Sequence, residues 1–572
     1  MKIFKQVVVF LLLTFLMISL VSCKDSKDSN VFTGEGKGKN GTIKVEVTIE
    51  NNEIKKIDVV ENHESEFTKD VFTKVINSIV AQNNPDIDVL SGATWTSEGI
   101  ITAVKNAVDK SGIKLTPKVV ADDAKFEDVT TDIVVVGAGG AGLSASIAAK
   151  NSGVNVILVE KTAVVGGNTN YATGGLNAAE TKVQKEKGIE DSVELFVEDT
   201  MKGGKYLNNE ELVKVLAEKS AETVDWLIEM GADLTDVGRL GGASVDRAHR
   251  PTGGAAVGSN VAKALEKKAR EVGVDIRVDN KAVELLKNDD RITGIKVRDS
   301  KGHEYSINAK VVILTTGGFG ANQDLVVKYK PELKGFGTTN QPGATGDAIG
   351  LGESVNADFV DLEQIQIHPT ASSVNGELIT EAVRGNGAIL VNIKGERFIN
   401  ELQTRDVVSA AELKQPEERV YLVFDQNVRD SLKAIEKYSK AGLLIESETL
   451  EELAKKINVN EENLVKTVAK YNGFVSNKND VDFGRTSMTT ELNKAPYYAL
   501  GVWPAVHHTM GGIKINTNAQ VIDKDGNIIK GLYAAGEVTG GVHGANRLGG
   551  NAMADITIFG RIAGLNAAKE AK

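Results

Sequence analysis

The sequence predicts a multidomain chain of mixed class, in which a small α+β domain precedes a larger α/β domain that an inserted domain interrupts. Residues 42–49 alternate between polar and apolar, which is typical of a half-buried strand. Residues 133–136 form a continuous apolar run before a Gly-rich turn, as expected of a parallel strand buried on both faces. Gly-rich sequence returns at residues 507–572, after a more charged helical stretch. This return indicates the insertion.

Composition limits the classes of function. The 572 residues carry a net charge of -11, and 41% of them are hydrophobic, which is ordinary for a globular protein. An acidic chain argues against a nucleic-acid partner, because phosphate binding needs a basic surface. Cys23 is the single cysteine. It excludes an intramolecular disulfide, a Cys-liganded iron–sulfur cluster and a Cys-x-x-Cys-His haem site, and no metal site is predicted.

The first residues are typical of a bacterial lipoprotein leader. Lys2 and Lys5 precede an apolar run over residues 7–21, which is too short to span a bilayer comfortably. Leu20-Val21-Ser22-Cys23 then matches a lipobox. We therefore expect a signal peptide over residues 1–23, acylation of Cys23, a tether over residues 24–30 and a lipid-anchored protein on the extracytoplasmic face of the cell membrane. An uncleaved anchor and an ordinary secretory signal are the alternatives.

The small domain is predicted over residues 31–115. Strands at 42–49 and 54–60 flank an Asn51-Asn52 turn, and residues 67–82 have helical spacing. A second helix is expected over residues 97–108, with Ser97 as its N-cap. Residues 116–128 contain a proline and several acidic residues, and they read as a linker.

The segment before this second helix carries a specific motif. Asp88 and Ser91-Gly92-Ala93-Thr94 form an Asp-x-x-Ser-Gly-Ala-Thr pattern, which resembles the site at which FMN-binding domains receive covalent FMN. The resemblance implies that a flavin transferase joins the FMN phosphate to the Thr94 hydroxyl. The alternative is an ordinary Gly turn before a helix. Trp95 could stack on the flavin or fill the core.

A dinucleotide-binding motif opens the larger domain. Gly137-Ala138-Gly139 and Gly142 lie between the strand at 133–136 and an Ala-rich helix over residues 143–150. The first Gly suits a tight turn, the second a close approach to pyrophosphate, and the third close helix–strand packing. Glu160 ends the next strand, where it can accept hydrogen bonds from a ribose. From this motif alone NAD and FAD both remain open.

Three further Gly-rich segments favour FAD. Gly166 to Gly175, Thr315 to Gly318 and Ala534 to Glu537 resemble the other flavin contacts of the glutathione-reductase-like FAD-binding fold, in the order typical of the fumarate reductase and succinate dehydrogenase flavoprotein superfamily. Asn168 stands where membrane-bound members carry a histidine that binds FAD covalently, so noncovalent FAD is implied. The FAD contacts implied by the resemblance are Gly137, Ala138, Gly139, Gly142, Glu160, Lys161, Gly167, Asn168, Thr169, Gly174, Gly175, Gly317, Asp347, Glu537, Gly550 and Asn551.

Residues 130–572 resemble the soluble fumarate reductases of the flavocytochrome c type, in blocks at 368–370, 380–385, 404–406, 507–512 and 543–551. Arg and His side chains suit a dicarboxylate because they form charge-assisted hydrogen bonds with its carboxylates. The resemblance implies that His508 and Arg547 hold one carboxylate. It places His368, Thr380 and Arg405 at the other end.

The same resemblance implies the chemistry. Reduced FAD delivers a hydride to one alkene carbon and Arg405 donates a proton to the other, with Glu381 and Arg384 resupplying that proton. An unremarkable alternative is that Glu381 and Arg384, three residues apart, form only a helical ion pair. His507 could be structural, His543 is a weaker candidate, and His249 receives no role.

We expect the FAD-binding domain at residues 129–363 and 507–572, with a capping domain inserted at residues 364–506. The predicted function is an extracytoplasmic fumarate reductase in anaerobic respiration, in which covalent FMN relays electrons from a quinol-linked or flavinylated membrane donor. The alternatives are a reductase of another 2-enoate (urocanate, acrylate, methacrylate or a cinnamate), a non-catalytic flavin electron carrier, and an oxidase or steroid dehydrogenase. Arg239-Leu240 stands where some fumarate reductases carry Met residues, which leaves the substrate open.

Overall fold

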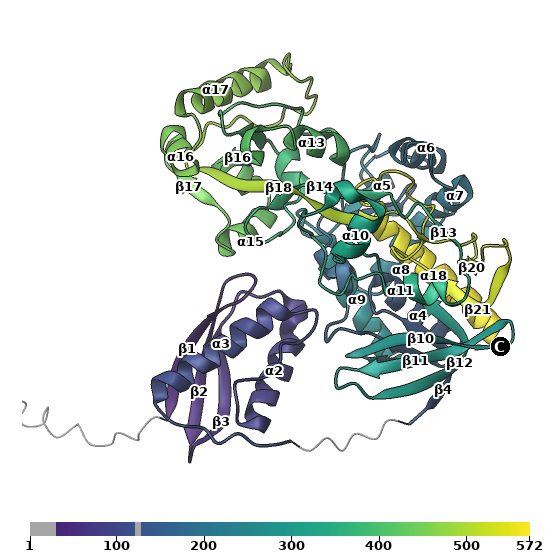
Figure 1. The fold of residues 1–572 in the computed structure, drawn as a ribbon. Coiled ribbons are helices and arrows are strands. Elements are labelled where there is room, and N and C mark those ends of the chain that lie inside the picture. The colour runs from purple at the N-terminus through teal and green to yellow at the C-terminus, as the bar shows by residue number, and fades with distance from the viewer. Residues whose placement is uncertain (1–29, 121–126) are drawn as a thin grey trace, which may run out of the picture. The chain divides into compact units, whose positions relative to one another are not determined.

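The structure is a computed structural model that describes residues 30–120 and 127–572. The predicted leader, Cys23 and part of the predicted linker lie outside the described residues. Within the described residues, no helix is long and apolar enough to cross a membrane. The chain separates into two compact units, an N-terminal unit and a larger C-terminal unit (Figure 1).

The N-terminal unit contains an antiparallel sheet of strands β1 (Val31–Lys37), β2 (Thr42–Glu50) and β3 (Glu53–Glu61), in that order. The predicted turn is confirmed, because Asn51 and Asn52 both have left-handed backbones, with φ of 52° and 62°. Such a two-residue turn matches the twist of a hairpin. The alternation predicted for β2 is also confirmed, and its buried side chains are Ile43, Val45, Val47 and Ile49.

Two helices, α2 (Lys69–Gln82) and α3 (Thr94–Ser111), pack on this sheet (Figure 1). A Cβ atom on Gly34 would lie 1.9 Å from the carbonyl oxygen of Ala103, so β1 and α3 approach closely only because Gly34 is a glycine. The prediction of Ser97 as an N-cap is wrong. Gly92, with φ of 83°, turns the chain early enough for the helix to begin at Thr94, and Ser97 is buried inside it.

The C-terminal unit is built on an eight-stranded sheet in the order β10-β11-β21-β12-β4-β5-β9, with β20 paired to β21. Strands β4, β5, β9, β12 and β21 pair in parallel, and β10 and β11 form an antiparallel extension. The bounds are β4 (Val129–Val136), β5 (Val156–Val159), β9 (Asp275–Arg277), β10 (Asn280–Asn288), β11 (Arg291–Asp299), β12 (Glu304–Leu314), β20 (Gln520–Ile522) and β21 (Ile528–Ala534).

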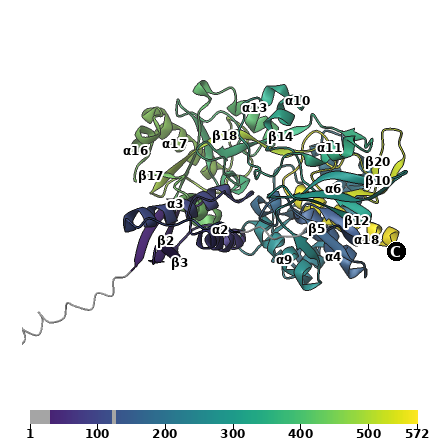
Figure 2. The ribbon, with the colours of Figure 1, turned by 60° about the horizontal axis from the view of Figure 1, so that its bottom comes forward.

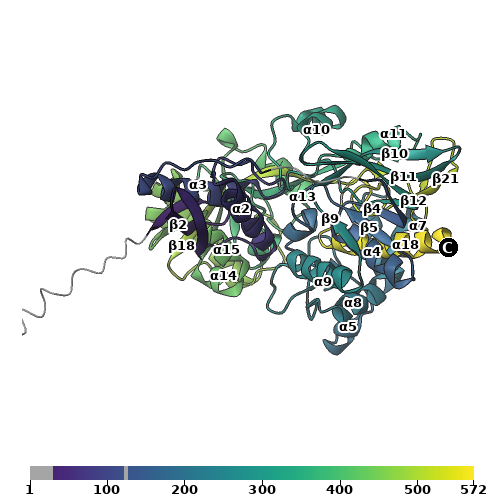
Figure 3. The same cartoon turned by 90° about the horizontal axis from the view of Figure 1, so that it is seen from below.

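Helices α4 (Gly140–Asn151), α9 (Val257–Glu271) and α18 (Asn551–Ala571) cover this sheet (Figure 3). The α4 and α18 backbones nearly touch, since a Cβ atom on Gly564 would lie 2.2 Å from the carbonyl oxygen of Ala145. Smaller elements complete the region: α5 (Lys182–Glu186), α6 (Val193–Gly203), α7 (Glu210–Glu218), α8 (Ser220–Glu229), α10 (Gln323–Tyr329), α11 (Asp347–Glu353), β6 (Leu176–Asn177), β7 (Asp236–Gly238), β8 (Ala248–Arg250), β13 (Phe359–Val360) and β19 (Gly512–Ile513).

A second sheet, of β14 (Ile365–Ser372), β18 (Tyr497–Thr509), β16 (Val420–Asp425), β15 (Ile389–Asn392) and β17 (Ile445–Ser447), occupies the region expected to be the capping domain (Figure 2). It has its own hydrophobic core. The boundary expected after residue 506 falls inside β18, which runs from this sheet to the FAD side. The helices are α12 (Glu381–Gly385), α13 (Arg405–Glu412), α14 (Gln426–Ser431), α15 (Ala434–Lys440), α16 (Leu450–Ile457) and α17 (Glu461–Asn477).

Candidate active site

A large cavity lies at the carboxyl ends of the parallel strands of the C-terminal unit. Residues directly after β4, β5, β12 and β21 line it, represented by Gly137, Glu160, Thr315 and Ala535. In α/β sheets ligands bind at this edge. At its far end the cavity reaches Arg405 of the capping region.

The glycine loop after β4 brings the backbone close to the cavity. Gly137 has φ of 103°, and a Cβ atom there would lie 2.5 Å from the carbonyl oxygen of Thr315. At Gly142 a Cβ atom would lie 1.9 Å from the carbonyl oxygen of Gly137. Gly139 differs, because a Cβ atom there would lie 3.9 Å from the nearest atom, the carbonyl oxygen of Gly166. The loop is therefore tight on its protein side and open toward the cavity, at the N-terminus of α4.

Charged side chains also line the cavity near the glycine loop. The Glu160 carboxylate accepts hydrogen bonds from the backbone N–H groups of Ala138 and Thr162, both at 2.8 Å. Burial raises the pKa of Glu160 in spite of them. Lys161 Nζ donates to Asp347 Oδ2 at 2.6 Å. Burial favours a raised pKa for Asp347, but Lys161 outweighs it and holds this pKa below its ordinary value.

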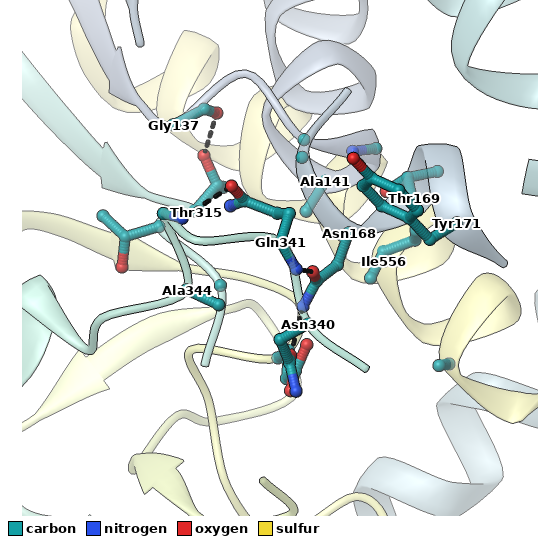
Figure 4. A pocket seen from close by; sticks show the side chains of 18 of the residues that line it. Gly137, Ala141, Asn168, Thr169, Tyr171, Thr315, Asn340, Gln341, Ala344 and Ile556 are labelled. Carbon is teal, nitrogen blue, oxygen red and sulfur yellow. Dashed lines mark hydrogen bonds between the residues drawn. The ribbon is translucent and has the colours of Figure 1, made fainter. Parts of the chain in front are cut away.

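Asn168 is tied to a segment that the sequence reasoning missed (Figure 4). Its Nδ2 donates to Asn340 Oδ1 at 2.6 Å, and its Oδ1 accepts from the Gln341 backbone N–H at 2.9 Å. Both partners line the cavity. A polar, Gly-flanked stretch at residues 337–346 was the available signal. The amide at this position is therefore fixed by two hydrogen bonds.

Most of the residues expected to contact FAD line the cavity: Gly137, Gly139, Glu160, Lys161, Gly167, Asn168, Thr169, Gly174, Gly175, Gly317, Asp347, Glu537 and Gly550. Ala138 and Gly142 lie behind the wall. Asn551 also lies outside the lining, because its side chain accepts from Asn177 Nδ2 at 2.7 Å and donates to Thr200 Oγ1 at 3.1 Å. Lining residues without a sequence prediction include Tyr171, Ala344, Met553 and Ile556.

Two arginines converge at the capping end of the cavity. Arg405 Nη1 donates to Gln366 Oε1 at 2.9 Å, and Arg547 Nη2 donates to the same oxygen at 3.2 Å. Gln366 was not predicted. It is 3% exposed, and it lies opposite His508 in the pairing of β14 with β18. Two guanidinium groups that share one neutral oxygen leave positive charge for an anionic ligand.

His508 lies beside these arginines on the cavity wall. Its Nδ1 has no hydrogen-bond partner within the described part of the chain. Burial, and then the charge of Arg547, lower the pKa of His508 well below its ordinary value. Its ring meets that of His543 edge-on at 5.3 Å, and His543 Nε2 lies 3.2 Å from Asp555 Oδ2. The His508 ring therefore lines the cavity, with its Nδ1 buried and unpaired among the described residues.

Behind Arg405 lies a layer of buried groups from the capping region. Arg405 Nε donates to Glu381 Oε1 at 2.5 Å, and Arg384 Nη2 lies 3.9 Å from the same oxygen. His368 Nε2 is 3.8 Å from this oxygen, and Thr380 is the N-cap of α12. The four predicted residues behind Arg405 are thus together, although they do not line the cavity.

The electrostatics of this layer favour a charged Glu381. Burial alone would raise the pKa of Glu381, but Arg405, Arg384 and Arg547 outweigh burial and lower it. For Arg547, burial first and Arg405 second lower the pKa to about 9. The Thr370 backbone N–H donates to His368 Nδ1 at 3.2 Å, so Nε2 carries the proton when this ring is neutral.

Two other segments of uncertain role are now located. His249 is fully buried, with Nε2 2.8 Å from Thr181 Oγ1 and Nδ1 2.9 Å from the Arg247 carbonyl oxygen, so its contacts are structural. Arg239 pairs with Asp246 at the surface. Leu240 is buried beside Gly549, near Glu381.

Trp95 of the N-terminal unit is 51% exposed, which rules out the core-filling alternative. His507 lines the cavity, and its Nδ1 lies 2.7 Å from Thr339 Oγ1.

The cavity suits FAD by its own chemistry. The open glycine loop at the N-terminus of α4 can receive a pyrophosphate. The buried Glu160 carboxylate can hold a ribose diol. Gly550, with φ of 89°, precedes α18, whose first turn lines the other end. These features fit a long dinucleotide that extends from the glycine loop to Arg547.

The chain matches two families. An FAD binding domain family matches residues 132–553, and an FMN-binding domain family matches residues 38–109. A fumarate reductase (cytochrome) of Shewanella frigidimarina is 52% identical over 444 residues, which cover 77% of this chain and 78% of that protein. A urocanate reductase of Eggerthella lenta is 35% identical over 571 residues, covering 96% of this chain and 94% of that protein.

Among solved structures, the open conformation of a flavocytochrome c3 fumarate reductase matches with a TM-score of 0.69 and 45% identity. The match covers 81% of this chain and 84% of that one. Fold, cavity and sequence agree on a flavin site joined to an FMN-binding domain. The chain belongs to the FAD-dependent fumarate reductase and succinate dehydrogenase family of oxidoreductases, which act on CH–CH bonds.

Proposed function

We propose that this protein reduces fumarate to succinate. The observation that carries the proposal is the convergence of Arg405 and Arg547 on one neutral oxygen, in a cavity that His508 also lines. A dicarboxylate would replace that weak acceptor with full negative charges. The relative named fumarate reductase (cytochrome) supports this substrate.

The residues of the chain bind, orient and protonate the substrate. Bound FAD would supply the hydride. His508 and Arg547 hold one carboxylate. Their polarisation of this carboxylate draws electrons from the far alkene carbon, which can then accept a hydride, and it stabilises the negative charge that develops on the carboxylate. Arg405 contacts the other end and donates a proton to the substrate. Its 2.5 Å contact with Glu381 provides the route by which this proton is restored, with Arg384 behind it.

The unusual donor has a physical basis. An arginine ordinarily keeps its proton. Here three arginines crowd one carboxylate, and Arg405 figures among the charges that lower the pKa of Arg547. In the proposed step, Glu381 lies 2.5 Å from Arg405 Nε and replaces the proton that Arg405 gives to the substrate.

The N-terminal domain relays electrons in this proposal. FMN joined to Thr94 would remain attached in an extracytoplasmic protein, where a dissociable cofactor would be lost. A flavin can pass electrons singly or in pairs, so it can connect a quinol-linked or flavinylated membrane donor to FAD. Acylated Cys23 would hold the chain at the membrane.

The test is anaerobic oxidation of reduced methyl viologen by protein produced with a flavin transferase, with fumarate, urocanate, acrylate and a cinnamate offered separately. Turnover on fumarate that Arg405→Ala abolishes while FAD is retained is the expected result. Thr94→Ala should lose covalent FMN and keep viologen-driven turnover. Absence of turnover on all four acids would refute a catalytic role.

A related 2-enoate reductase is the second candidate. The near full-length match to a urocanate reductase favours it. Leu240 beside Gly549 is the residue to examine, since it packs close to Glu381. Turnover on urocanate in place of fumarate would change the assigned substrate and leave the proposed mechanism unchanged.

A further inference from the structure

The capping region holds buried polar groups that the proposed reaction does not use. They lie on helix α13 (Arg405–Glu412), which begins at the active site. Arg405, Ser409 and Glu412 follow one another at helical spacing, so they share one face of this helix. Ser409 and Glu412 are both 0% exposed. The face therefore carries polar groups from the substrate site into the protein interior.

These polar groups are unusual because they lack partners. Within the described residues, Ser409 Oγ, both carboxyl oxygens of Glu412 and Arg384 Nε have no hydrogen-bond partner. Leaving a buried polar atom unsatisfied costs about 1–3 kcal/mol, and proteins usually avoid this cost with internal water. Internal water would satisfy Ser409 and Glu412 on α13 together with Arg384 on α12, and we call this group of buried polar atoms the hydrated track.

Glu412 differs in charge state from the other carboxylate of the region. Burial raises the pKa of Glu412 well above its ordinary value, and the charge of Arg384 opposes this only in part. Glu381, by contrast, has a lowered pKa because arginines surround it. Arg384 is influenced by both carboxyl groups, since Glu381 and Glu412 each act against the effect of burial on its pKa. Both carboxyl groups thus act on the pKa of Arg384, whose Nη2 lies 3.9 Å from Glu381 Oε1.

We propose that Glu412 holds a proton that feeds Arg384, and so extends the relay of Arg384, Glu381 and Arg405 by two turns of α13. The proposal rests on the proposed reduction of an enoate at Arg405. Seven residues separate Arg405 from Glu412, which is about 10 Å along the helix axis. The next residues, Leu413 and Lys414, are exposed. Glu412 itself is buried, and the exposed surface at the outer end of the helix begins at the next residue.

The proton balance is simple. In each turnover an N–H bond of Arg405 breaks and a C–H bond of the product forms. Arg384 passes a proton to the charged Glu381, and Glu381 passes a proton on to Arg405. The O–H bond of Glu412 breaks as Arg384 regains its proton, and a solvent proton then restores the neutral acid. No electron moves along this path. Glu412 acts only through Arg384, so its role is to supply and position the proton.

Infrared difference spectroscopy of the FAD-loaded protein tests the proposal directly. The wild-type protein should show the carbonyl band of a protonated carboxylic acid at neutral pH, and this band should shift in D2O. Glu412→Gln should remove it. This readout does not depend on turnover, so it separates failure of the proposed substrate from failure of the relay.

Turnover supplies the second readout. Glutamine has the shape of the protonated acid and is likewise neutral. If Glu412 had only a structural role, Glu412→Gln would therefore leave turnover unchanged. We expect at least a ~10-fold lower kcat, an unchanged KM and a larger solvent isotope effect, because general acid steps contribute about 10²–10⁴-fold. Glu417→Gln is the matched control, since the Glu417 side chain is 65% exposed. It should leave all three quantities unchanged.

Two outcomes would overturn the proposal: an infrared band that survives in Glu412→Gln, or a variant with wild-type kcat and isotope effect. Should Glu412→Gln lose FAD, Ser409→Ala takes over the test. It deletes one hydroxyl of the track, and it should shift the Glu412 band and lower kcat. An unmoved band in Ser409→Ala would contradict the hydrated track.

Discussion

Replacing Glu381 with glutamine separates the two tasks assigned to Arg405, which are to bind a carboxylate and to donate a proton. Arg405 Nε donates to Glu381 Oε1 at 2.5 Å, and glutamine can still accept that hydrogen bond through its amide oxygen. It cannot accept and return a proton at neutral pH. The geometry of Arg405 should survive while the resupply of its proton is lost.

The structure gives the size and sign of both effects. Loss of a general acid–base group lowers kcat by about 10²–10⁴-fold, which corresponds to about 3–5 kcal/mol of transition-state stabilisation. Substrate binding, in contrast, should become tighter in this variant. A charge about 6 Å from a substrate carboxylate repels it by about 3 kcal/mol at an effective dielectric of ~20, as an upper limit. Removing the negative charge of Glu381 should therefore lower KM for a dianion.

The assay is anaerobic viologen oxidation over a range of fumarate concentrations, with FAD content measured by absorbance. Glu446→Gln is the control, because the Glu446 side chain is 53% exposed in the same region. We expect Glu381→Gln to combine a much lower kcat with a KM at or below that of the wild type. A raised KM with kcat preserved would refute the reasoning, since it would make Glu381 a binding group only.

Three further predictions concern stability and cofactor retention. Burial lowers the pKa of His249 from 6.5 to about 4, so between these pH values the unfolded chain binds a proton that the folded chain does not. Stability should fall as pH falls through this window, by at most about 3 kcal/mol from this residue, and thermal unfolding of His249→Gln should show a shallower pH dependence. Glu401→Gln should lower the melting temperature, because Glu401 is 0% exposed and accepts hydrogen bonds from Arg397 and Arg485. Breaking such a buried network costs about 3–5 kcal/mol of folding free energy. A melting temperature equal to that of the wild type would contradict this prediction. Gly142→Ala should abolish FAD retention, since the added Cβ would lie 1.9 Å from the Gly137 carbonyl oxygen, whereas Gly350→Ala, with no described atom within 4 Å of its Cβ position, should retain FAD.

Local sequence signals predicted those parts of the fold that depend on local geometry. The hairpin at Asn51-Asn52 and helix α2 (Lys69–Gln82) follow from turn chemistry and from apolar spacing, and both are present. The start of α3 was mispredicted because Ser97 resembles an N-cap, whereas the turn is made at Gly92. A cap residue predicts a boundary only when the backbone before it must leave the helix.

The candidate site shows the limit of the same reasoning. Arg405, His508 and Arg547 were identified because the sequence blocks that contain them resemble those of the flavocytochrome c-type fumarate reductases. Gln366 was missed, since an uncharged amide in a strand carries no pattern of its own. Only the register of β14 with β18, which pairs Gln366 with His508, places its oxygen between the two guanidinium groups. Long-range register is a property of the fold, and no local pattern reveals it.

The distribution of the charged groups leads to a last argument about selectivity. His508 lies near the end of β18 and Arg547 shortly before α18, whereas Arg405 is the first residue of capping helix α13. In the proposed reaction Arg405 both binds a carboxylate and donates the proton. A substrate with a carboxylate at only one end would satisfy Arg547 and leave Arg405 bound to Gln366 and Glu381, with no charge to draw it toward the alkene. A second carboxylate pulls Arg405 toward the carbon that it must protonate. Binding the second carboxylate and delivering the proton are then one event, and this coupling favours a short dicarboxylate over a monocarboxylic enoate.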